Sequence, residues 1–252
     1  MTRPTGQRLS FAQHTHFFLL ALSFLTRLAP ARIGTEAELA RSTIYYPVAG
    51  LVLGAVLTTP FFLGLFSNTP FLQAWWYVAA GAYLTRGLHY DGLADICDAL
   101  GSGPARFHAV LKDSRLGAFG ALGLCIAISG MLCGVYALCL SGQYVVLLLL
   151  PCWSRSLPAV LATLSFPHPD ATLGRILFLH PQKQAALTGA CFFMLSALWA
   201  TGGNATLLCL MVTSGCVLFT RSLATQYGGY NGDLFGMLIV LAEVAIPVIL
   251  AA

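Results

Sequence analysis

Three carboxylates occur at helical spacing in the stretch 89–98, where Asp91, Asp95 and Asp98 follow one another at intervals of four and three residues. At about 100° per residue these side chains fall within an arc of about 60°, so one face of a helix presents all three. Like charges on one face repel one another, and a divalent cation removes that repulsion. Mg²⁺ is suited to such oxygen ligands, usually together with phosphate oxygens of a substrate. The spacing therefore predicts a magnesium site, with a solvated acidic helix turn as the alternative.

A second candidate motif, KDSRLG, follows at 112–117, where Lys112 and Arg115 flank Asp113. Cations beside carboxylates suit a phosphate-handling site, because a metal neutralises one side of a phosphate while Lys or Arg binds the other. We therefore expect Lys112 and Arg115 to contact a phosphate-bearing substrate. Anchoring of a membrane protein by basic residues is the alternative.

Two charged residues lie inside apolar segments: Arg155 in the run 151–158 and Glu243 in the last apolar stretch. Ionisable side chains at such depth usually face the interior of a helix bundle and are paired. Arg155 and Glu243 could pair with each other. A purely structural ion pair and a role in the site are weighed equally.

The segment GGYNGD (228–233) is rich in glycine and precedes the last apolar stretch. Its backbone amides could approach a phosphate closely, because glycine has no side chain. Asn231 and Asp233 add polar side chains here, and His89, two positions before Asp91, adds one to the acidic stretch. We include these three side chains among the candidate substrate contacts.

The composition shows which kind of protein must position these residues. Only 9% of the 252 residues are charged, 58% are hydrophobic, and the mean hydropathy is +0.79. A soluble domain has about a quarter charged residues, so this chain cannot cover itself with a water-facing surface. These values exclude a soluble enzyme and a disordered chain, and the dispersed net charge of +4 argues against nucleic acid as a partner.

Long apolar stretches predict an all-α polytopic membrane protein, a bundle of about seven transmembrane helices. They cover residues 44–66, 71–88, 119–140, 144–164, 185–201, 205–219 and 234–251. The stretch 205–219 is short and becomes convincing only if it continues to Arg221. An earlier apolar run, 17–25, imitates a signal peptide, but His14 and His16 interrupt the approach to it. We expect this run to be an uncleaved interfacial or re-entrant segment.

The whole chain, 1–252, is expected to form one integral membrane catalytic domain. Its parts include an N-terminal cytoplasmic or interfacial segment, 1–43, and an acidic cytoplasmic active-site connection, 89–118. All 13 Lys and Arg residues lie before residue 44, in 89–118, 165–184 or 221–233, or in the apolar stretches that adjoin these segments, and none lies in 67–70, 141–143 or 202–204. The positive-inside rule places the basic side in the cytoplasm.

Five motifs stand out along the chain: FLTRL (24–28), YPVAG (46–50), GLHYDGLADICD (87–98), KDSRLG (112–117) and GGYNGDLFG (228–236). Together they resemble the motifs of the cobalamin synthase family, the adenosylcobinamide-GDP ribazoletransferases. The resemblance runs from about residue 18 to residue 243, and the acidic block followed by KDSRLG is its most specific part. The chain departs from the family pattern at Ala99, where glycine is common, and at Tyr230 and Asn231, where Gln-Thr is familiar.

The resemblance implies a multi-pass enzyme of the bacterial cytoplasmic (inner) membrane that performs the last assembly step of coenzyme B12. Family members use Mg²⁺ as a cofactor and join adenosylcobinamide-GDP to α-ribazole or α-ribazole 5′-phosphate, releasing GMP. The product is adenosylcobalamin or its 5′-phosphate. Its new bond is a phosphodiester to the ribose 3′ oxygen.

Combining the resemblance with the positions of the charges gives a hypothesis for the site. Asp91 and Asp95 hold Mg²⁺, and Asp98 or Asp113 completes the metal shell or acts as the general base. Breaking a pyrophosphate requires cations against the departing GMP. Lys112 and Arg115 would supply them, together with Arg27, Arg155 and Arg221. The remaining substrate contacts are assigned to His89, Ser114, Asn231 and Asp233.

Two alternatives remain. A CDP-alcohol phosphotransferase also places several Asp residues at cytoplasmic helix ends, but its pattern has Asp-Gly at the second Asp, whereas here Gly92 follows the first. A polytopic transporter or channel would use Arg155 and Glu243 to line a pathway. The sequence is also compatible with a homo-oligomer in the lipid bilayer.

Overall fold

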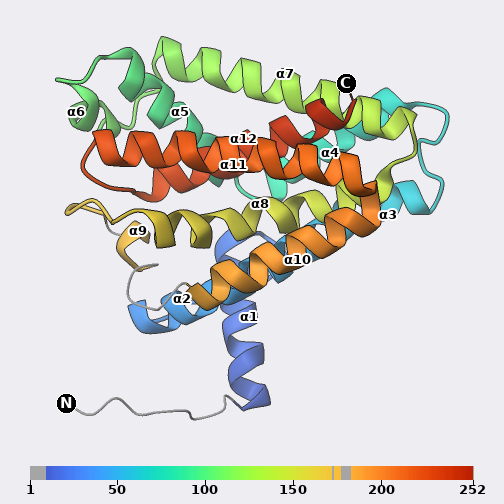
Figure 1. Cartoon of the computed structure of the whole chain (residues 1–252), viewed down its shortest axis with the longest axis horizontal. Coiled ribbons are helices and arrows are strands. Elements are labelled where there is room, and N and C mark those ends of the chain that lie inside the picture. Colours follow the sequence, from blue (N-terminus) through green and yellow to red (C-terminus); the bar gives the residue numbers. More distant parts are fainter. Residues whose placement is uncertain (1–9, 172, 177–182, 252) are drawn as a thin grey trace.

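The structure, a computed structural model, describes residues 10–171, 173–176 and 183–251. All named elements within these residues are helices, which confirms the predicted all-α fold (Figure 1). They are α1 (Phe11–Leu25), α2 (Glu36–Ser42), the 3-10 helix η1 (Thr43–Tyr45), α3 (Tyr46–Phe62), α4 (Pro70–Leu84), α5 (Leu88–Gly101), α6 (Phe107–Leu111), α7 (Ala118–Leu140), α8 (Tyr144–Leu164), α9 (Leu173–Ile176), α10 (Lys183–Thr201), α11 (Gly203–Gln226) and α12 (Gly232–Ala251).

Six segments of the described chain are long and apolar enough to cross a membrane: Glu36–Phe62, Ala118–Leu140, Tyr144–Leu164, Gln184–Thr201, Gly203–Gln226 and Gly232–Ala251. They match six of the predicted spans, and α11 continues past Arg221, which gives the short stretch 205–219 the length of a span. The remaining predicted span, 71–88, corresponds to α4, which has only 15 residues and ends before Thr85. Such a helix is about 22 Å long, shorter than the ~30 Å hydrocarbon core.

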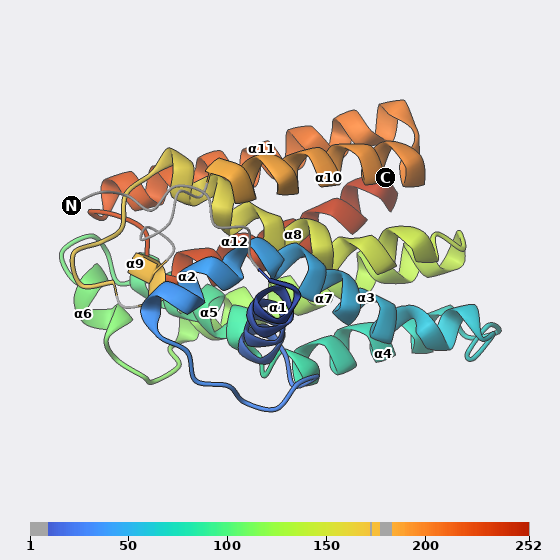
Figure 2. The ribbon, with the colours of Figure 1, turned by 90° about the horizontal axis from the view of Figure 1, so that it is seen from below.

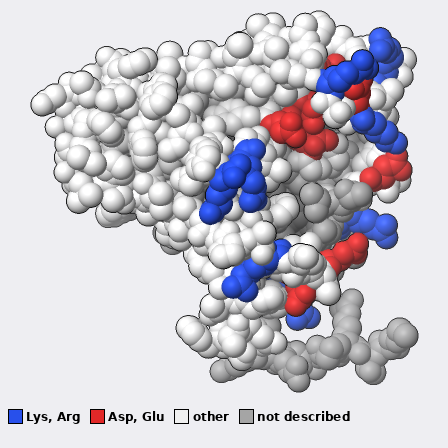
Figure 3. Space-filling model, turned by 180° about the vertical axis from the view of Figure 1, so that it is seen from behind, with Lys and Arg blue, Asp and Glu red and all other residues white. Residues whose placement is uncertain are grey.

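The helices run lengthwise through the bundle, and their connections gather at its two ends (Figures 1 and 2). The connections after α3, α7 and α10 lie at one end, whereas α6, α9 and the turn between α11 and α12 lie at the other. On the face shown in Figure 3, Lys, Arg, Asp and Glu gather towards the right of the view, which is the α6 end, and the left is uncharged. The bundle therefore has one charged end.

Helix α8 forms the centre of the bundle, with 83% of its most apolar segment buried. Its neighbour α3 approaches it closely through Gly50 and Gly54. A Cβ atom at these positions would lie 2.2 Å from the carbonyl oxygen of Pro151 and 2.0 Å from that of Leu148. Small residues at four-residue spacing permit such contacts between membrane helices, so the α3–α8 packing is encoded in the sequence.

Helix α1 does not follow the direction of the bundle. It stands crosswise to the long axis in Figure 1 and is seen nearly end-on in Figure 2. A capping box between Ser10 and Gln13 begins the helix, and Arg86 donates hydrogen bonds to the carbonyl oxygens of Ser23 and Thr26 near its end. The crosswise orientation agrees with an interfacial or re-entrant segment rather than with a further span.

Candidate active site

The predicted acidic helix exists as α5, which confirms the helical spacing of its carboxylates. Gly87 precedes it with φ of +66°, a left-handed conformation that suits glycine and turns the chain out of α4. Leu93 and Ile96 are buried against the core, whereas Asp91 is exposed and Asp95 is half-buried. The apolar face thus anchors α5 and leaves these two carboxylates at its surface.

The first turn of α12 lies directly against α5. A Cβ atom at Gly92 would lie 2.8 Å from the carbonyl oxygen of Asp233 and 2.9 Å from its Cα atom, so glycine is required for this contact. The contact brings Asp233 from near the end of the chain into electrostatic range of Asp91 and Asp95. The contact therefore assembles one site from two motifs that are far apart in the sequence.

Asn231 begins α12 and orients Asp233. Its side-chain oxygen accepts a hydrogen bond from the N–H of Leu234 at 2.9 Å, which is the usual contact of a helix N-cap. Its side-chain nitrogen donates to Oδ2 of Asp233, also at 2.9 Å. One asparagine therefore both caps the helix and positions a carboxylate, a role that the sequence did not indicate.

The electrostatics of the site are those of an uncompensated acidic cluster. Burial raises the pKa of Asp95 from 3.8 to about 6, and the negative charges of Asp91, Asp233 and Asp98 add to this effect. A proton or a cation would relieve the repulsion. The cluster is therefore a favourable place for positive charge.

Asp98 makes contacts of a different kind. Its two carboxylate oxygens accept hydrogen bonds of 2.7 Å from the backbone N–H groups of Gly117 and Gly120, at the start of α7. These bonds satisfy donors that lack partners within the helix and place negative charge at its positive end. Asp98 thus joins α5 to α7, and its predicted role as a metal ligand or general base stays a prediction.

The residues of the cluster fit Mg²⁺. Among the described residues, no three His, Cys, Asp or Glu side chains form a ready enclosure for a metal ion. Mg²⁺ does not require one, because it is commonly held by one or two carboxylates together with water and substrate phosphates. Asp91 and Asp95 provide hard oxygen ligands one helical turn apart. Burial is the main cause of the raised pKa of Asp95, and the neighbouring negative charges that add to it are charges that a cation would neutralise.

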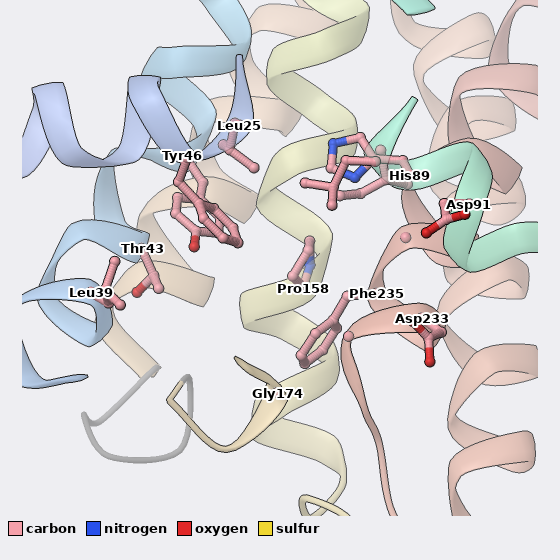
Figure 4. A pocket seen from close by; sticks show the side chains of 15 residues that line it. Leu25, Leu39, Thr43, Tyr46, His89, Asp91, Pro158, Gly174, Asp233 and Phe235 are labelled. Atoms are coloured by element: carbon pink, nitrogen blue, oxygen red, sulfur yellow. The ribbon is translucent and has the colours of Figure 1, made fainter. Parts of the chain in front are cut away.

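Two cavities meet at this cluster, and Gly232 and Asp233 line both of them. The first, here called the apolar cavity, has a volume of about 150 Å³ and lies between α1 to α3 on one side and α5 and α12 on the other (Figure 4). Its wall is mostly apolar, and His89, Asp91 and Asp233 lie together on its α5 and α12 side. The wall residues include Leu25, Leu39, Tyr46, Leu88, Phe235 and Ile239.

The second cavity, here called the polar cavity, has a volume of about 230 Å³ and lies between α6, the segment 168–171 and the turn before α12. Aromatic contacts build its wall: Phe107 stacks on Tyr227 with ring centroids 3.6 Å apart, and His108 lies 4.8 Å from His168. Its remaining polar side chains include Lys112, Asp170 and Asn231. The cavity is therefore rich in groups that can contact a nucleotide or a phosphate.

Sequence reasoning did not find His108, His168 and Asp170. These side chains come from two connections that are far apart in the chain, and no spacing rule links them. The structure joins the connections through an ion pair of 3.2 Å between Lys112 Nζ and Asp170 Oδ2, together with the contact of the two histidine rings. Tyr227 could have been found, because it immediately precedes the glycine-rich motif.

The segment 113–115 lies beside these cavities without lining them. Arg115 Nη2 lies 2.6 Å from Asp113 Oδ2, and the Arg115 side chain is 88% exposed. Hydrogen bonds from Arg115 lower the pKa of Asp113 to about 2, which makes its carboxylate a weak base. Ser114, between them, is exposed. The predicted substrate contacts of Ser114 and Arg115 stay predictions, as does the predicted role of Asp113 as a metal ligand or general base.

Arg155 and Glu243 pair with each other, which the sequence indicated as a possibility. Nη1 of Arg155, on α8, contacts Oε1 of Glu243, on α12. Ser154 donates to the same Glu243 oxygen at 2.9 Å, and Arg155 also donates to the carbonyl oxygen of Pro151 at 3.1 Å. The pair links two central helices, and neither residue lines the apolar or the polar cavity.

The other two predicted phosphate contacts lie elsewhere. Arg27 donates to the carbonyl oxygen of Tyr83 at 3.0 Å and its guanidinium lies 5.0 Å from the centre of the Tyr83 ring, so it ties the end of α1 to α4. Arg221 is exposed on α11. Neither lines the two cavities, whereas His89, Lys112, Asn231 and Asp233 each line at least one.

Replacing Asn231 by serine is expected to lower turnover about tenfold while leaving the stability of α12 nearly unchanged. Serine is also a good N-cap, but it cannot donate to Asp233 as the asparagine amide does. Turnover and thermal unfolding of the variant check both parts. A variant that lost stability without losing turnover would show that the cap is the only role of Asn231.

The fold and the site together define a polytopic membrane protein with a cluster of carboxylates at the charged end of its helix bundle. A family model described as Cobalamin-5-phosphate synthase matches residues 17–251. The chain therefore belongs to the cobalamin-5-phosphate synthase family.

Three relatives illustrate the similarity, and each is named adenosylcobinamide-GDP ribazoletransferase. The protein from Nitratidesulfovibrio vulgaris (strain DP4) is 40% identical over 92% of this chain and 95% of its own length. That of Ectopseudomonas mendocina is 37% identical over 92% and 97%, and that of Syntrophobacter fumaroxidans is 36% identical over 90% and 94%. No solved structure matches the chain.

Proposed function

We propose that this chain transfers the phosphocobinamide group of adenosylcobinamide-GDP to α-ribazole or α-ribazole 5′-phosphate and releases GMP. The family and the names of its relatives support this activity. One structural observation carries the proposal: Asp91 and Asp233 come together from two motifs at the junction of two cavities of different polarity. A reaction that joins two unlike substrates needs such a junction.

Asp91 and Asp95 are the residues that would hold Mg²⁺, with Asp233 nearby. The ion would neutralise phosphate oxygens of the donor when it is bound. Lys112, in the polar cavity, stabilises the negative charge that the departing GMP acquires. The donor is then oriented with its pyrophosphate at the carboxylate cluster.

Asp233 is our candidate for the general base. It lines both cavities, so its carboxylate can reach the ribose hydroxyl of an acceptor in one while the donor occupies the other. The hydroxyl proton passes to Asp233, the ribose oxygen bonds to the phosphorus that carries cobinamide, and the bond from that phosphorus to the bridging oxygen of GMP breaks. Asn231 holds the accepting carboxylate in place.

We also propose that the charged end of the bundle faces the cytoplasm of a bacterial inner membrane. The Lys and Arg residues of that end support this orientation through the positive-inside rule. The C-terminus lies towards the other end in Figures 1 and 2. An epitope fused to the C-terminus should then be reached from outside in intact spheroplasts, and protection of that epitope would overturn the orientation.

The test of the activity is GMP release by the purified protein in detergent or nanodiscs, with both substrates and with or without Mg²⁺. We expect release that requires acceptor and Mg²⁺ and that yields a cobamide product. No ion or substrate gradient is present in detergent, so the result also separates an enzyme from a transporter. Absence of release by folded protein that binds neither substrate would overturn the proposal.

Activity is expected to fall as the pH is lowered through about 6, because Asp95 then becomes protonated and loses its affinity for Mg²⁺. The pKa of Asp95 in the metal-free folded protein, about 6, lies above its ordinary value of 3.8. Between about pH 4 and 6 the folded state therefore binds a proton that the unfolded state has lost, and the stability of the fold decreases as the pH rises through this range. Above about pH 6 the charged carboxylate opposes folding. Mg²⁺ titrations followed by thermal unfolding at several pH values measure how the Mg²⁺ affinity and the stability change with pH. Asp95→Asn should weaken Mg²⁺ binding at high pH and make the Mg²⁺ affinity less dependent on pH.

A further inference from the structure

The apolar cavity differs from the polar cavity in its charges. Among the described residues, its ionisable wall side chains apart from tyrosine are His89, Asp91 and Asp233, and they include neither Lys nor Arg. The polar cavity contains Lys112 and two histidines. Away from an ion held by Asp91, a phosphate in the apolar cavity would have no cation beside it among the described wall residues, which is unfavourable. The cavity is suited to an uncharged and largely apolar group.

The size and wall of the apolar cavity fit an aromatic ring system. An apolar cavity of about 150 Å³ is large enough to bind benzene, and this one has a similar volume, so it can hold an aromatic ring whose attached sugar extends towards Asp233. Tyr46 and Phe235 lie on opposite sides of the cavity (Figure 4). Aromatic faces on both sides favour a flat occupant.

One polar atom at this cavity has no partner within the described chain. His89 is 93% buried and its Nε2 makes no hydrogen bond; the residue lies between this cavity and a smaller one that Arg155 and Glu243 line. Leaving a buried polar atom unpaired costs free energy, and such atoms are commonly paired when a ligand binds. An acyl chain of a lipid offers no hydrogen bond, whereas a heteroaromatic base or its ribose does. His89 therefore favours a nucleoside over a lipid as the occupant.

We propose that the apolar cavity binds the uncharged aromatic base of the acceptor nucleoside, with His89 Nε2 as its hydrogen-bond partner, and that the polar cavity binds the guanine nucleotide end of the donor. This inference rests on the proposed function and assigns one substrate to each cavity. The ribose of the acceptor then extends to Asp233, where the cavities meet. A 5′-phosphate on the acceptor lies outside the apolar wall.

A pair of matched substitutions tests the assignment. Leu39 lines the apolar cavity and Leu111 lines the polar cavity, and both are half-buried. We expect Leu39→Trp to raise the KM for the acceptor about tenfold with little change in the KM for the donor, and Leu111→Trp to do the reverse. Leu195→Trp, at an exposed position of α10, is the control and should change neither.

Direct binding of the acceptor nucleoside, measured calorimetrically without donor, tests the role of His89. His89→Phe keeps a flat ring but removes the hydrogen bond, and we expect it to weaken binding about tenfold. His89→Gln restores a polar group near the position of Nε2 and should recover much of the affinity. A purely structural histidine would instead show lower thermal stability in both variants with unchanged nucleoside affinity.

The outcomes separate this inference from the proposed function. If wild-type protein releases GMP but Leu39→Trp raises the KM for the donor, or for neither substrate, the assignment of the cavities is wrong. Nucleoside binding that is unaffected by both Leu39→Trp and His89→Phe overturns it as well, and would leave lipid as the occupant. If wild-type protein releases no GMP, nucleoside binding still tests the cavity independently.

Discussion

Replacing Asp91 by asparagine is expected to reduce Mg²⁺-dependent GMP release by about a thousandfold, while the helix bundle stays folded. Asparagine has nearly the same shape as aspartate but carries no charge, so the proposed Mg²⁺ site loses one of its two charged ligands. Asp91 is exposed on α5 and lines the apolar cavity beside Asp233, so the substitution removes charge without leaving a hole in the core. Single-turnover GMP release and Mg²⁺ affinity are the measurements.

Asp98→Asn is the matched comparison, because it removes a carboxylate from the same helix. Both oxygens of Asp98 accept backbone hydrogen bonds from α7, and an asparagine provides only one such acceptor. We expect lower thermal stability with largely retained Mg²⁺ affinity. Full activity of Asp91→Asn, or loss of Mg²⁺ affinity in Asp98→Asn at unchanged stability, would contradict this division between the two carboxylates.

The contrast between Asp91 and Asp98 shows how far the sequence could take the site. Helical spacing is a local property, so the common face of Asp91, Asp95 and Asp98 could be predicted from sequence distance alone. The partner of each carboxylate depends on tertiary packing. Asp98 accepts hydrogen bonds at the start of α7, and Asp95 is affected by the charge of Asp233 in the first turn of α12. Neither relation leaves a local signal in the chain.

The fold was predictable for a similar reason. Continuous apolar stretches with few charges must be helical in lipid, since backbone groups there have no water to bind, and the bounds of α7 and α8 follow the predicted spans within one residue. Helix α4 is shorter than its apolar stretch, because the chain turns at Thr85 and Arg86 to begin α5. Arg86 has φ of +59°, a conformation that hydropathy does not reveal.

The position of a cation in the sequence predicted its role less well than the side chains that surround it in the fold. Arg115 sits two positions from Asp113 and pairs with it, and Arg27 contacts Tyr83, so each cation already has a partner within the described chain. Lys112 also pairs, with Asp170, yet it lines the polar cavity. A cavity is formed by segments that meet in space, and for this reason His108 and His168 could not be assigned from the sequence.

Replacing Glu243 by alanine is expected to destabilise the protein by about 3–5 kcal/mol, the largest effect on stability that we anticipate. Arg155 is only 2% exposed, and loss of Glu243 leaves its guanidinium charged, buried and without an anionic partner. The lowered melting temperature is measurable in detergent. Glu36→Ala, on the exposed side of α2, is the control and should be nearly neutral.

A neutral double variant separates a structural ion pair from a functional one. Arg155→Met with Glu243→Leu removes both charges and fills similar space, so we expect it to recover most of the stability lost in Glu243→Ala. Neither residue lines the apolar or the polar cavity, and a structural pair therefore predicts that GMP release also recovers. Recovered stability without activity would instead place Arg155 or Glu243 among the functional residues, because only a role in the reaction or in a transport pathway would require the charges themselves.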